Sequence, residues 1–211
     1  MKQKTAQLWT PFRNIVLESF PDLENTCNWA DWEEKGTSLS AKIYKNKHIL
    51  KSREVLIWDE KSSIYNTIIY PKTGSNLPCF GIDLMAFFEK KVVMVFDFQH
   101  PTENYLFSHP DLPKSTGEYR FFEPGNHFSE NIYVAKCTMS DVGDHLDMFK
   151  KYLTAYKNMV ELECPSGEDV SVYSDFDKYM KRLDPVSGYL SSKFGKQKSE
   201  SLVNEFLFCY D

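Results

Sequence analysis

The sequence lacks the short motifs by which most nucleotide, metal and nucleophile sites are recognised. It contains no G-x-G-x-x-G or G-x-x-x-x-G-K-[ST] phosphate-binding loop, no H-E-x-x-H metal motif and no G-x-S-x-G nucleophile motif. The five histidines are scattered along the chain. These absences argue against a bound nucleotide, a structural metal ion and a serine nucleophile.

Cysteine is sparse and shows no pairing pattern. The five cysteines are odd in number and include no C-x-x-C pair, which indicates reduced thiols rather than a disulfide framework or a zinc site. No apolar run approaches the roughly 18 residues of a membrane-spanning helix, and the chain begins with a charged, amphipathic segment rather than a signal peptide. We therefore expect a cytoplasmic location (the host cytoplasm if a virus carries the gene) and no membrane contact.

The composition is that of a globular protein with an uneven charge distribution. The 211 residues, 42% hydrophobic and 26% charged, fit a single domain over 1–211, and the net charge of −5 argues against nucleic-acid binding. Between Lys178 and Lys198 there are six basic residues and one acidic residue. Such a stretch suits an acidic protein partner, although a solvated helix face would look the same. Aromatic residues reach 15%, which suits a flat conjugated ligand or ordinary core packing.

The spacing of apolar residues predicts a helix, then strands, then further helices. Strands are expected over 38–45, 52–59, 64–70, 79–88, 91–98 and 131–137, and helices over 7–20, 142–160, 173–182 and 199–208. Ser140 or Asp141 is expected to cap the second helix, and Gly188 and Gly195 to interrupt the C-terminal part. This order predicts an α+β protein with one mostly antiparallel sheet covered by helices.

One carboxylate, Asp83, lies inside an apolar, strand-like segment, Leu77–Met85. An ionised carboxylate in apolar surroundings is costly unless it is paired or protonated. Asp83 therefore either faces solvent from a half-exposed sheet or handles a proton. Alternation along the strand places Asp83 on the same face as Gly81, which leaves room for a ligand to approach closely.

Other polar residues are candidates with ordinary alternatives. Asp184 stands before a proline, as is typical of a helix end or a turn. Glu54 and Asn66 lie in strand-like segments and could simply face outward. His127 lies in a loop of small polar residues, and such loops often line sites.

Taken together, these segments resemble the ferredoxin-dependent bilin reductases over nearly the whole chain. The matching segments are Tyr65–Pro71, Leu77–Asp83, Phe96–Pro101, Tyr119–Glu123, Gly125–Ser129, Val172–Asp177, Leu183–Pro185 and Asn204–Phe208. No single segment is diagnostic, but their order and spacing are specific. The likeness is greatest to the cyanophage-type branch, which makes phycoerythrobilin.

The resemblance implies a fold and a chemistry. The fold would be an α/β/α sandwich, with a central antiparallel sheet flanked by helices on both faces and the bilin between the sheet and the C-terminal helices. The enzyme would hold no permanent cofactor and would take electrons from reduced [2Fe-2S] ferredoxin to reduce biliverdin IXα. We expect a monomer whose partners are ferredoxin and the bilin.

The resemblance also implies residue roles. Asp83 matches the aspartate of the family's F-G-x-D motif, and Asp184 matches its C-terminal aspartate. These acids would protonate bilin radicals, Asp83 at the C15 methine bridge and Asp184 at the A-ring diene. Further expected bilin contacts are Asn66, Ser129, His127, Glu54, Lys136 and Arg120. The residues expected to dock ferredoxin are Lys178, Lys181, Arg182, Lys193 and Lys196.

Two positions differ from relatives, and three functions stay open. Asn66 stands where phycocyanobilin-forming members carry a histidine, which argues against that product, and Ser187 stands where an arginine is expected. The chain would carry out the four-electron reduction of biliverdin to phycoerythrobilin, one of the two-electron steps through 15,16-dihydrobiliverdin, or non-enzymatic bilin carriage. A carrier would need no pair of acids.

Overall fold

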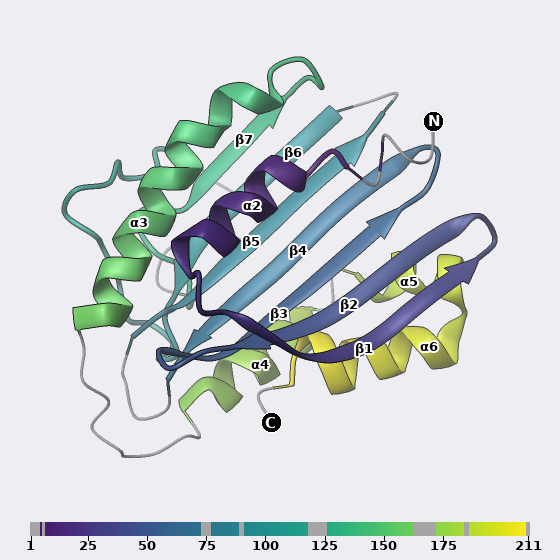
Figure 1. Cartoon of the computed structure of the whole chain (residues 1–211). Helices are drawn as coiled ribbons and strands as arrows, with labels where there is room; N and C mark the ends of the chain where they lie inside the picture. The colour runs from purple at the N-terminus through teal and green to yellow at the C-terminus, as the bar shows by residue number, and fades with distance from the viewer. Residues whose placement is uncertain are drawn as a thin grey trace.

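Within the part of the chain that the structure describes, seven strands form one sheet in which every strand pairs antiparallel with its neighbour in sequence (Figure 1). The computed structural model describes residues 5, 7–72, 77–88, 91–117, 126–162, 172–183 and 186–209. The strands are β1 (Glu24–Glu34), β2 (Thr37–Lys45), β3 (Ile49–Trp58), β4 (Ser62–Pro71), β5 (Cys79–Phe87), β6 (Lys91–Gln99) and β7 (Tyr133–Cys137).

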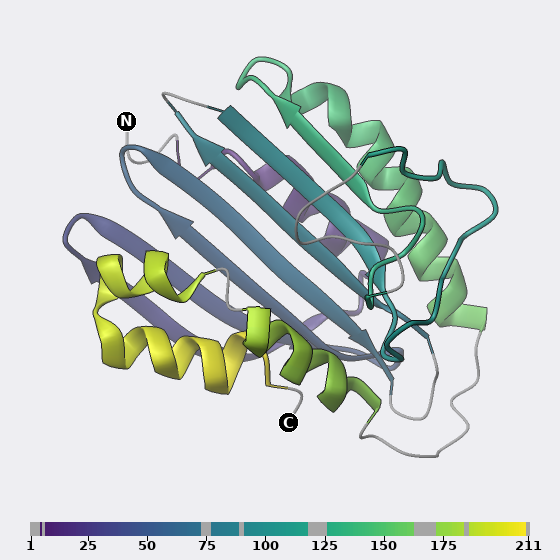
Figure 2. The same cartoon turned by 180° about the vertical axis from the view of Figure 1, so that it is seen from behind.

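Helices cover both faces of this sheet. On one face lie α2 (Thr10–Ser19) and α3 (Leu146–Leu162), the latter preceded by the 3-10 turn η1 (Val142–His145). On the other lie α4 (Val172–Leu183), α5 (Ser187–Phe194), α6 (Lys196–Ser201) and the π-helical turn η2 (Leu202–Leu207), as Figure 2 shows from behind. The expected α/β/α sandwich is confirmed. No described helix is both long and apolar enough to cross a membrane.

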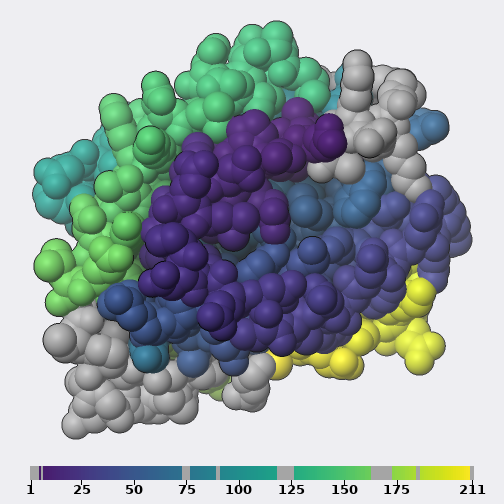
Figure 3. Space-filling view, viewed as in Figure 1, coloured from purple at the N-terminus to yellow at the C-terminus, as the bar shows by residue number. Residues whose placement is uncertain are grey.

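The face under α2 and α3 carries one continuous apolar core. Alternate strand residues such as Phe80, Leu84 and Phe96 point to this face and meet Phe12 of α2 and Phe149 of α3, all of them buried. In the space-filling view α2 lies over the sheet with α3 beside it (Figure 3). Apolar packing of α2 and α3 therefore closes this face of the sheet.

On the opposite face the apolar residues fall into three separate clusters. Val55 and Ile57 pack against α5 and η2. Tyr70 packs against α4, while Val95 and Phe128 form a third cluster near β7. The C-terminal helices therefore contact the sheet through several apolar clusters, and polar side chains occupy the space between them.

The structure differs from the sequence-based expectations in three places. The edge strand β1 was not expected, because most of its side chains are polar and exposed and the burial pattern of a half-covered strand is absent. Gly188 lies inside α5 and does not break it, whereas Gly195, with a φ of 82°, separates α5 from α6. Asp141 precedes η1 without capping it, since its carboxylate accepts hydrogen bonds from Thr138 and Ser140.

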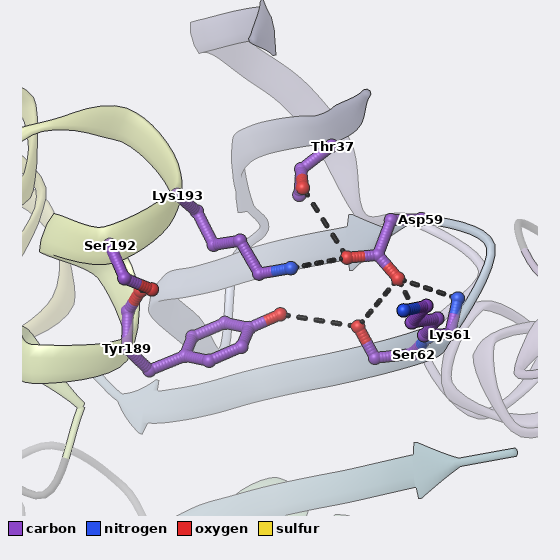
Figure 4. Close-up of polar contacts among 7 residues, drawn as sticks. All are labelled: Thr37, Asp59, Lys61, Ser62, Tyr189, Ser192 and Lys193. Atoms are coloured by element: carbon purple, nitrogen blue, oxygen red, sulfur yellow. Dashed lines mark hydrogen bonds and ion pairs between the residues drawn. The ribbon is translucent and has the colours of Figure 1, made fainter. Parts of the chain in front are cut away.

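An ion pair ties α5 to the turn between β3 and β4 (Figure 4). Lys193 Nζ lies 2.6 Å from Asp59 Oδ2, which also accepts a hydrogen bond from the Thr37 hydroxyl. The other carboxylate oxygen, Oδ1, accepts hydrogen bonds from the Ser62 hydroxyl and the Lys61 backbone N–H. Burial alone would raise the pKa of Asp59, but these donors lower it to about 2. Lys193 was expected to dock ferredoxin; its charge is instead used inside the protein, and we withdraw that assignment.

We expect Lys193→Met to lower the free energy of unfolding by about 1–2 kcal/mol at neutral pH, because it leaves a mostly buried carboxylate without its cation. Since the folded-state pKa of Asp59 lies below its usual value of 3.8, this contribution is present above about pH 4 and is lost as the pH falls through about 2. Urea unfolding at several pH values measures the difference.

The matched control is Lys196→Met, which removes an exposed lysine that lies 3.7 Å from Glu200 on the same short helix. It should change stability little. Equal losses for the two variants, or a Lys193→Met loss that persists at pH 2, would contradict the account.

Candidate active site

Three polar side chains lie on adjacent strands and share the face that the C-terminal helices cover. Asn66 of β4 stands directly opposite Asp83 of β5, and Arg53 of β3 lies diagonally across from Asn66. Arg53 Nη1–H donates to Asn66 Oδ1 at 3.1 Å, and Asn66 Nδ2 lies 3.5 Å from Asp83 Oδ1. The alternation of three neighbouring strands thus brings a guanidinium, an amide and a carboxyl into one row.

This row lines a cavity of about 90 Å³ between the sheet and the helices. Its walls include Gly81 and Gln99 from the sheet, and Phe176, Val186 and Phe208 from the helical layer. Asp83 is therefore surrounded by apolar groups above and by Arg53 and Asn66 beside it.

The surroundings of Asp83 shift the pKa of its carboxyl toward neutral pH. Burial raises the pKa of its carboxyl to about 6, against an ordinary value of 3.8, while the Asn66 amide and the positive charge of Arg53 oppose the rise. A carboxyl with such a pKa is protonated in about half of the molecules at pH 6 and in about a tenth of them at pH 7, and can give that proton to a basic group placed beside it.

A second buried acid, Asp97, lies on the same face of the neighbouring strand β6. It accepts the Ser129 backbone N–H at 3.0 Å and the Ser129 hydroxyl. Burial raises the pKa of Asp97 to about 8 despite these bonds. The signal that could have found Asp97 is the one that found Asp83, a lone carboxylate in an apolar strand. Ser129 was expected to contact the bilin; it is fully buried and bonded to Asp97, so its role here is to hold that acid.

His127 lies beneath α4 rather than in the cavity wall. Its ring packs against Phe176 at 5.6 Å and Tyr179 at 4.8 Å between ring centroids, and its Nδ1 lies 2.8 Å from the His100 carbonyl oxygen. Its backbone has a φ of 69°. These contacts give His127 a role in supporting α4, and the expectation of a direct bilin contact gains no support from its position.

Glu54 faces the wrong side of the sheet for a substrate contact. It is the neighbour of Arg53 in β3, so alternation directs its side chain toward α2. There its carboxylate lies 2.7 Å from Arg13 Nε and accepts a hydrogen bond from the Tyr44 hydroxyl at 3.2 Å. The position of Glu54 therefore gives no support to its assignment as a bilin contact, and Arg53 is the β3 residue that lines the cavity.

The remaining expected contacts are only partly placed. Lys136 of β7 is exposed and pairs in register with Val93, which puts it on the same face of the sheet as Asp83. Arg120 and Asp184 lie outside the described residues. Val186, two positions after Asp184 in the sequence, lines the cavity.

Basic side chains gather on the outer side of the C-terminal helices. Lys178 and Arg182 are exposed on α4, while Lys181 and Lys196 line a surface hollow of about 390 Å³. Lys178 forms an exposed ion pair with Asp175, and Lys181 donates to the Asn204 carbonyl oxygen. This group is kept as the candidate partner surface and is here named the α4–α6 basic surface: Lys178, Lys181, Arg182 and Lys196.

The described residues contain no cluster of three or more histidine, cysteine, aspartate or glutamate side chains able to hold a metal ion. The chemistry that the candidate site itself offers is proton donation from Asp83, hydrogen bonding from Asn66 and a positive charge from Arg53. Such a site suits a substrate whose basicity increases during the reaction.

Comparisons with known proteins point to one family. The sequence model described as "Ferredoxin-dependent bilin reductase" matches residues 17–209. The chain is 30% identical over 186 residues to the 15,16-dihydrobiliverdin:ferredoxin oxidoreductase of Nostoc punctiforme, covering 78% of this chain and 76% of that protein. It is 33% identical over 189 residues to the phycoerythrobilin:ferredoxin oxidoreductase of Prochlorococcus marinus subsp. pastoris, covering 77% and 72%.

A solved structure has the same fold. The structure of tomato phytochromobilin synthase in complex with biliverdin superposes with a TM-score of 0.71 at 17% identity, covering 95% of this chain and 82% of that one. At this identity the likeness establishes the fold alone.

We expect Gly81→Ala to push the Gln99 side chain aside, because an added Cβ would lie 2.6 Å from the amide atoms of Gln99. The cost should be about 1 kcal/mol of unfolding free energy, at the low end for an overpacked site because the clashing group is the end of a flexible side chain. Adding Gln99→Ala to Gly81→Ala should remove most of this clash. Two substitutions that act additively in a double-mutant cycle measured by urea unfolding would rule out the contact.

Proposed function

Because the chain belongs to the ferredoxin-dependent bilin reductase family, we propose that it reduces biliverdin IXα by four electrons to phycoerythrobilin, by way of 15,16-dihydrobiliverdin. Ferredoxin-dependent bilin reduction is the activity of the family. The finer assignment draws on relatives named for 15,16-dihydrobiliverdin and for phycoerythrobilin, which match this chain at similar identity, 30% and 33%. A single enzyme that carries out both steps would share features with both groups.

The main support for the proposal is the position of Asp83. It lies on the sheet face that the C-terminal helices cover, beside Asn66, in a cavity with apolar walls, and its pKa is raised to about 6. A reductase that receives single electrons must protonate the reduced pigment at a chosen carbon, and this requires an acid that still holds its proton near neutral pH.

The proposed sequence of steps conserves electrons and protons. Ferredoxin delivers one electron, which turns the bound bilin into a radical anion and raises its basicity. Asp83 then transfers a proton to the carbon of the C15 bridge, and a second electron and a second proton, the latter from solvent, complete the first two-electron reduction. In the second reduction ferredoxin is proposed to deliver two further electrons, one at a time, while Asp184 gives one proton to the A-ring diene and solvent supplies the other. Asp83 regains its proton from solvent between turnovers.

Binding of the pigment requires the helical layer to rearrange. Pockets for drug-sized ligands have volumes of roughly 300–1,000 Å³, whereas the cavity beside Asp83 measures about 90 Å³. The Lys193–Asp59 pair anchors α5, while α4 is attached through hydrogen bonds from the Tyr70 hydroxyl to Asp177 at 2.7 Å and from the Tyr173 hydroxyl to the Leu77 carbonyl oxygen at 2.8 Å. We propose that α4 moves outward when the bilin enters, since no ion pair among the described residues joins it to the sheet.

The α4–α6 basic surface is the proposed docking site for ferredoxin. The opposite charge of an acidic partner would be attracted to Lys178 and Arg182, which are exposed on the helix that covers the cavity. Docking there would place the electron donor on the outer side of the same layer whose inner side faces the pigment.

The test of the function is an anaerobic assay with biliverdin, ferredoxin and a reducing system, with absorbance spectra and chromatography of the extracted pigment. Transient dihydrobiliverdin that converts to phycoerythrobilin supports the four-electron proposal. Dihydrobiliverdin as the end product, or turnover only when dihydrobiliverdin is supplied, would assign a two-electron step instead. A stable pigment complex that never turns over would identify a carrier.

We expect Asp83→Asn to slow the first reduction by about 10²–10⁴-fold, because an amide cannot supply the acidic proton. In the parent enzyme the single-turnover rate should fall as the pH rises above about 6, since the pKa of Asp83 is raised to that value and the deprotonated form accumulates above it. Stopped-flow absorbance of the enzyme–biliverdin complex measures both effects.

The control for this variant is Glu54→Gln, the same chemical change on the opposite face of the sheet. It should leave the rate per folded molecule within about twofold of the parent. Full product formed at the parental rate by Asp83→Asn would overturn the assignment of the first proton donor.

We expect the double charge reversal Lys178→Glu/Arg182→Glu to raise the KM for ferredoxin about fivefold or more at low salt, with little change in biliverdin binding. Raising the salt concentration should increase the KM of the parent enzyme for ferredoxin, because exposed charges are screened. The difference in KM between the parent and the variant should therefore become smaller. Reversing Lys157 on α3, which lies on the other face, provides the control. If the charge reversals on α3 and on α4 raise the KM for ferredoxin equally, ferredoxin does not dock specifically on the α4–α6 basic surface.

A further inference from the structure

Arg53 is the one cation among the described residues that line the cavity beside Asp83. Its side chain is 2% exposed, and no ion pair is formed by it within the described ranges. Its Nε–H is buried and has no hydrogen-bond acceptor there. A buried guanidinium with an unused donor is costly for the folded protein, and a ligand that enters the cavity could complete its hydrogen bonding.

The guanidinium is held in a defined orientation. One Nη1–H bonds Asn66, and the group lies over the Phe208 ring, 5.4 Å from its centroid. A guanidinium carries five N–H donors in a rigid plane. With one donor used by Asn66 and one face covered by Phe208, the plane of Arg53 is fixed next to the cavity.

We propose that Arg53 is a substrate-positioning residue that donates hydrogen bonds to a lactam carbonyl oxygen of the bilin, an inference that rests on the proposed function. The bilin offers two kinds of oxygen acceptor, the lactam carbonyls at its ends and the propionate carboxylates. The lactam is favoured because the cavity beside Arg53 is walled by Ile68, Val186 and Phe208, and a neutral carbonyl is far cheaper to bury there than a carboxylate. Added electron density on the conjugated carbonyl would strengthen this bond as the radical forms.

Arg53 also fixes the orientation of the Asn66 amide. Since a guanidinium can only donate, Asn66 must turn its oxygen toward Arg53, which directs its NH₂ group toward Asp83. A single side chain thus sets both the position of the pigment oxygen and the hydrogen bond at the acid. Among the described residues, the charged groups on this face of the sheet include Lys51 and Arg53 of β3, Asp83 of β5, Asp97 of β6 and Lys136 of β7. Those on the helix above it are Asp175, Asp177, Lys178, Lys181 and Arg182 of α4.

The test compares Arg53→Gln and Arg53→Lys with the parent in two measurements. Biliverdin affinity, from absorbance titration without ferredoxin, should fall about 10- to 100-fold in Arg53→Gln and about 10-fold in Arg53→Lys, which lacks the planar fork. The pH midpoint of the single-turnover rate should rise in Arg53→Gln, because a positive charge that favours the ionised Asp83 is lost, and should stay near that of the parent in Arg53→Lys.

The matched control is Arg13→Gln, which removes the arginine on the opposite face of the sheet that pairs with Glu54. It should leave both the affinity and the pH midpoint unchanged. Thermal unfolding verifies that each variant is folded; if Arg53→Gln does not fold, the affinity of Arg53→Lys decides. Affinity within twofold of the parent in the folded Arg53 variants would overturn the proposal.

Biliverdin dimethyl ester separates the two kinds of oxygen. If Arg53 binds a lactam carbonyl, the loss of affinity in Arg53→Gln is the same for the ester as for biliverdin. If the loss disappears with the ester, Arg53 binds a propionate and the proposal is wrong. A parent protein that neither binds nor reduces biliverdin would instead overturn the proposed function itself, so the two failures are distinguishable.

Discussion

The row formed by Arg53, Asn66 and Asp83 is the constraint on which the arrangement of this molecule depends. These side chains project from three neighbouring strands into a face that is otherwise apolar. A helix cannot pack flat over such a row without burying polar groups. The apolar core on this face is accordingly divided into three clusters, whereas the face under α2 and α3 has a single core. The C-terminal helices are joined to the sheet by specific polar links at Asp59 and Asp177, which leaves a cavity above Asp83.

Three aspartates show how the same side chain is adapted to different tasks by its surroundings. Asp59 accepts several donors, including a lysine, and its pKa falls to about 2. Asp97 is buried with Ser129 as its main partner, and its pKa rises to about 8. Asp83 lies between these extremes, with a pKa of about 6, since one cation and one amide partly offset its burial. Of the three, it alone both lines the cavity and titrates close to neutrality, which suits repeated loss and recovery of a proton.

The sequence predicted the element order well where one face of an element is buried. Strands β2 to β7 and helix α3 were predicted close to their observed positions, and strand alternation placed Asp83 and Gly81 on the correct shared face. The edge strand β1 was not predicted, because most of its side chains are polar and exposed and the alternation of apolar and polar residues is absent. The site was harder to predict. Arg53 was not among the expected site residues, because only the register of β3 shows which of two adjacent residues, Arg53 or Glu54, faces the cavity. The pairing of Lys193 with Asp59 and of Ser129 with Asp97 was not predicted, because these partners are distant in sequence.

We propose that the pigment binds between the sheet and the C-terminal helices, with Asp83 beside it. The decisive experiment is a crystal structure of the enzyme with biliverdin. We expect the tetrapyrrole against the face that carries Arg53, Asn66 and Asp83, with α4 displaced outward and the Asp83 carboxyl within hydrogen-bonding distance of the pigment. A pigment bound on the α2–α3 side, or one that leaves Asp83 out of contact, would contradict it.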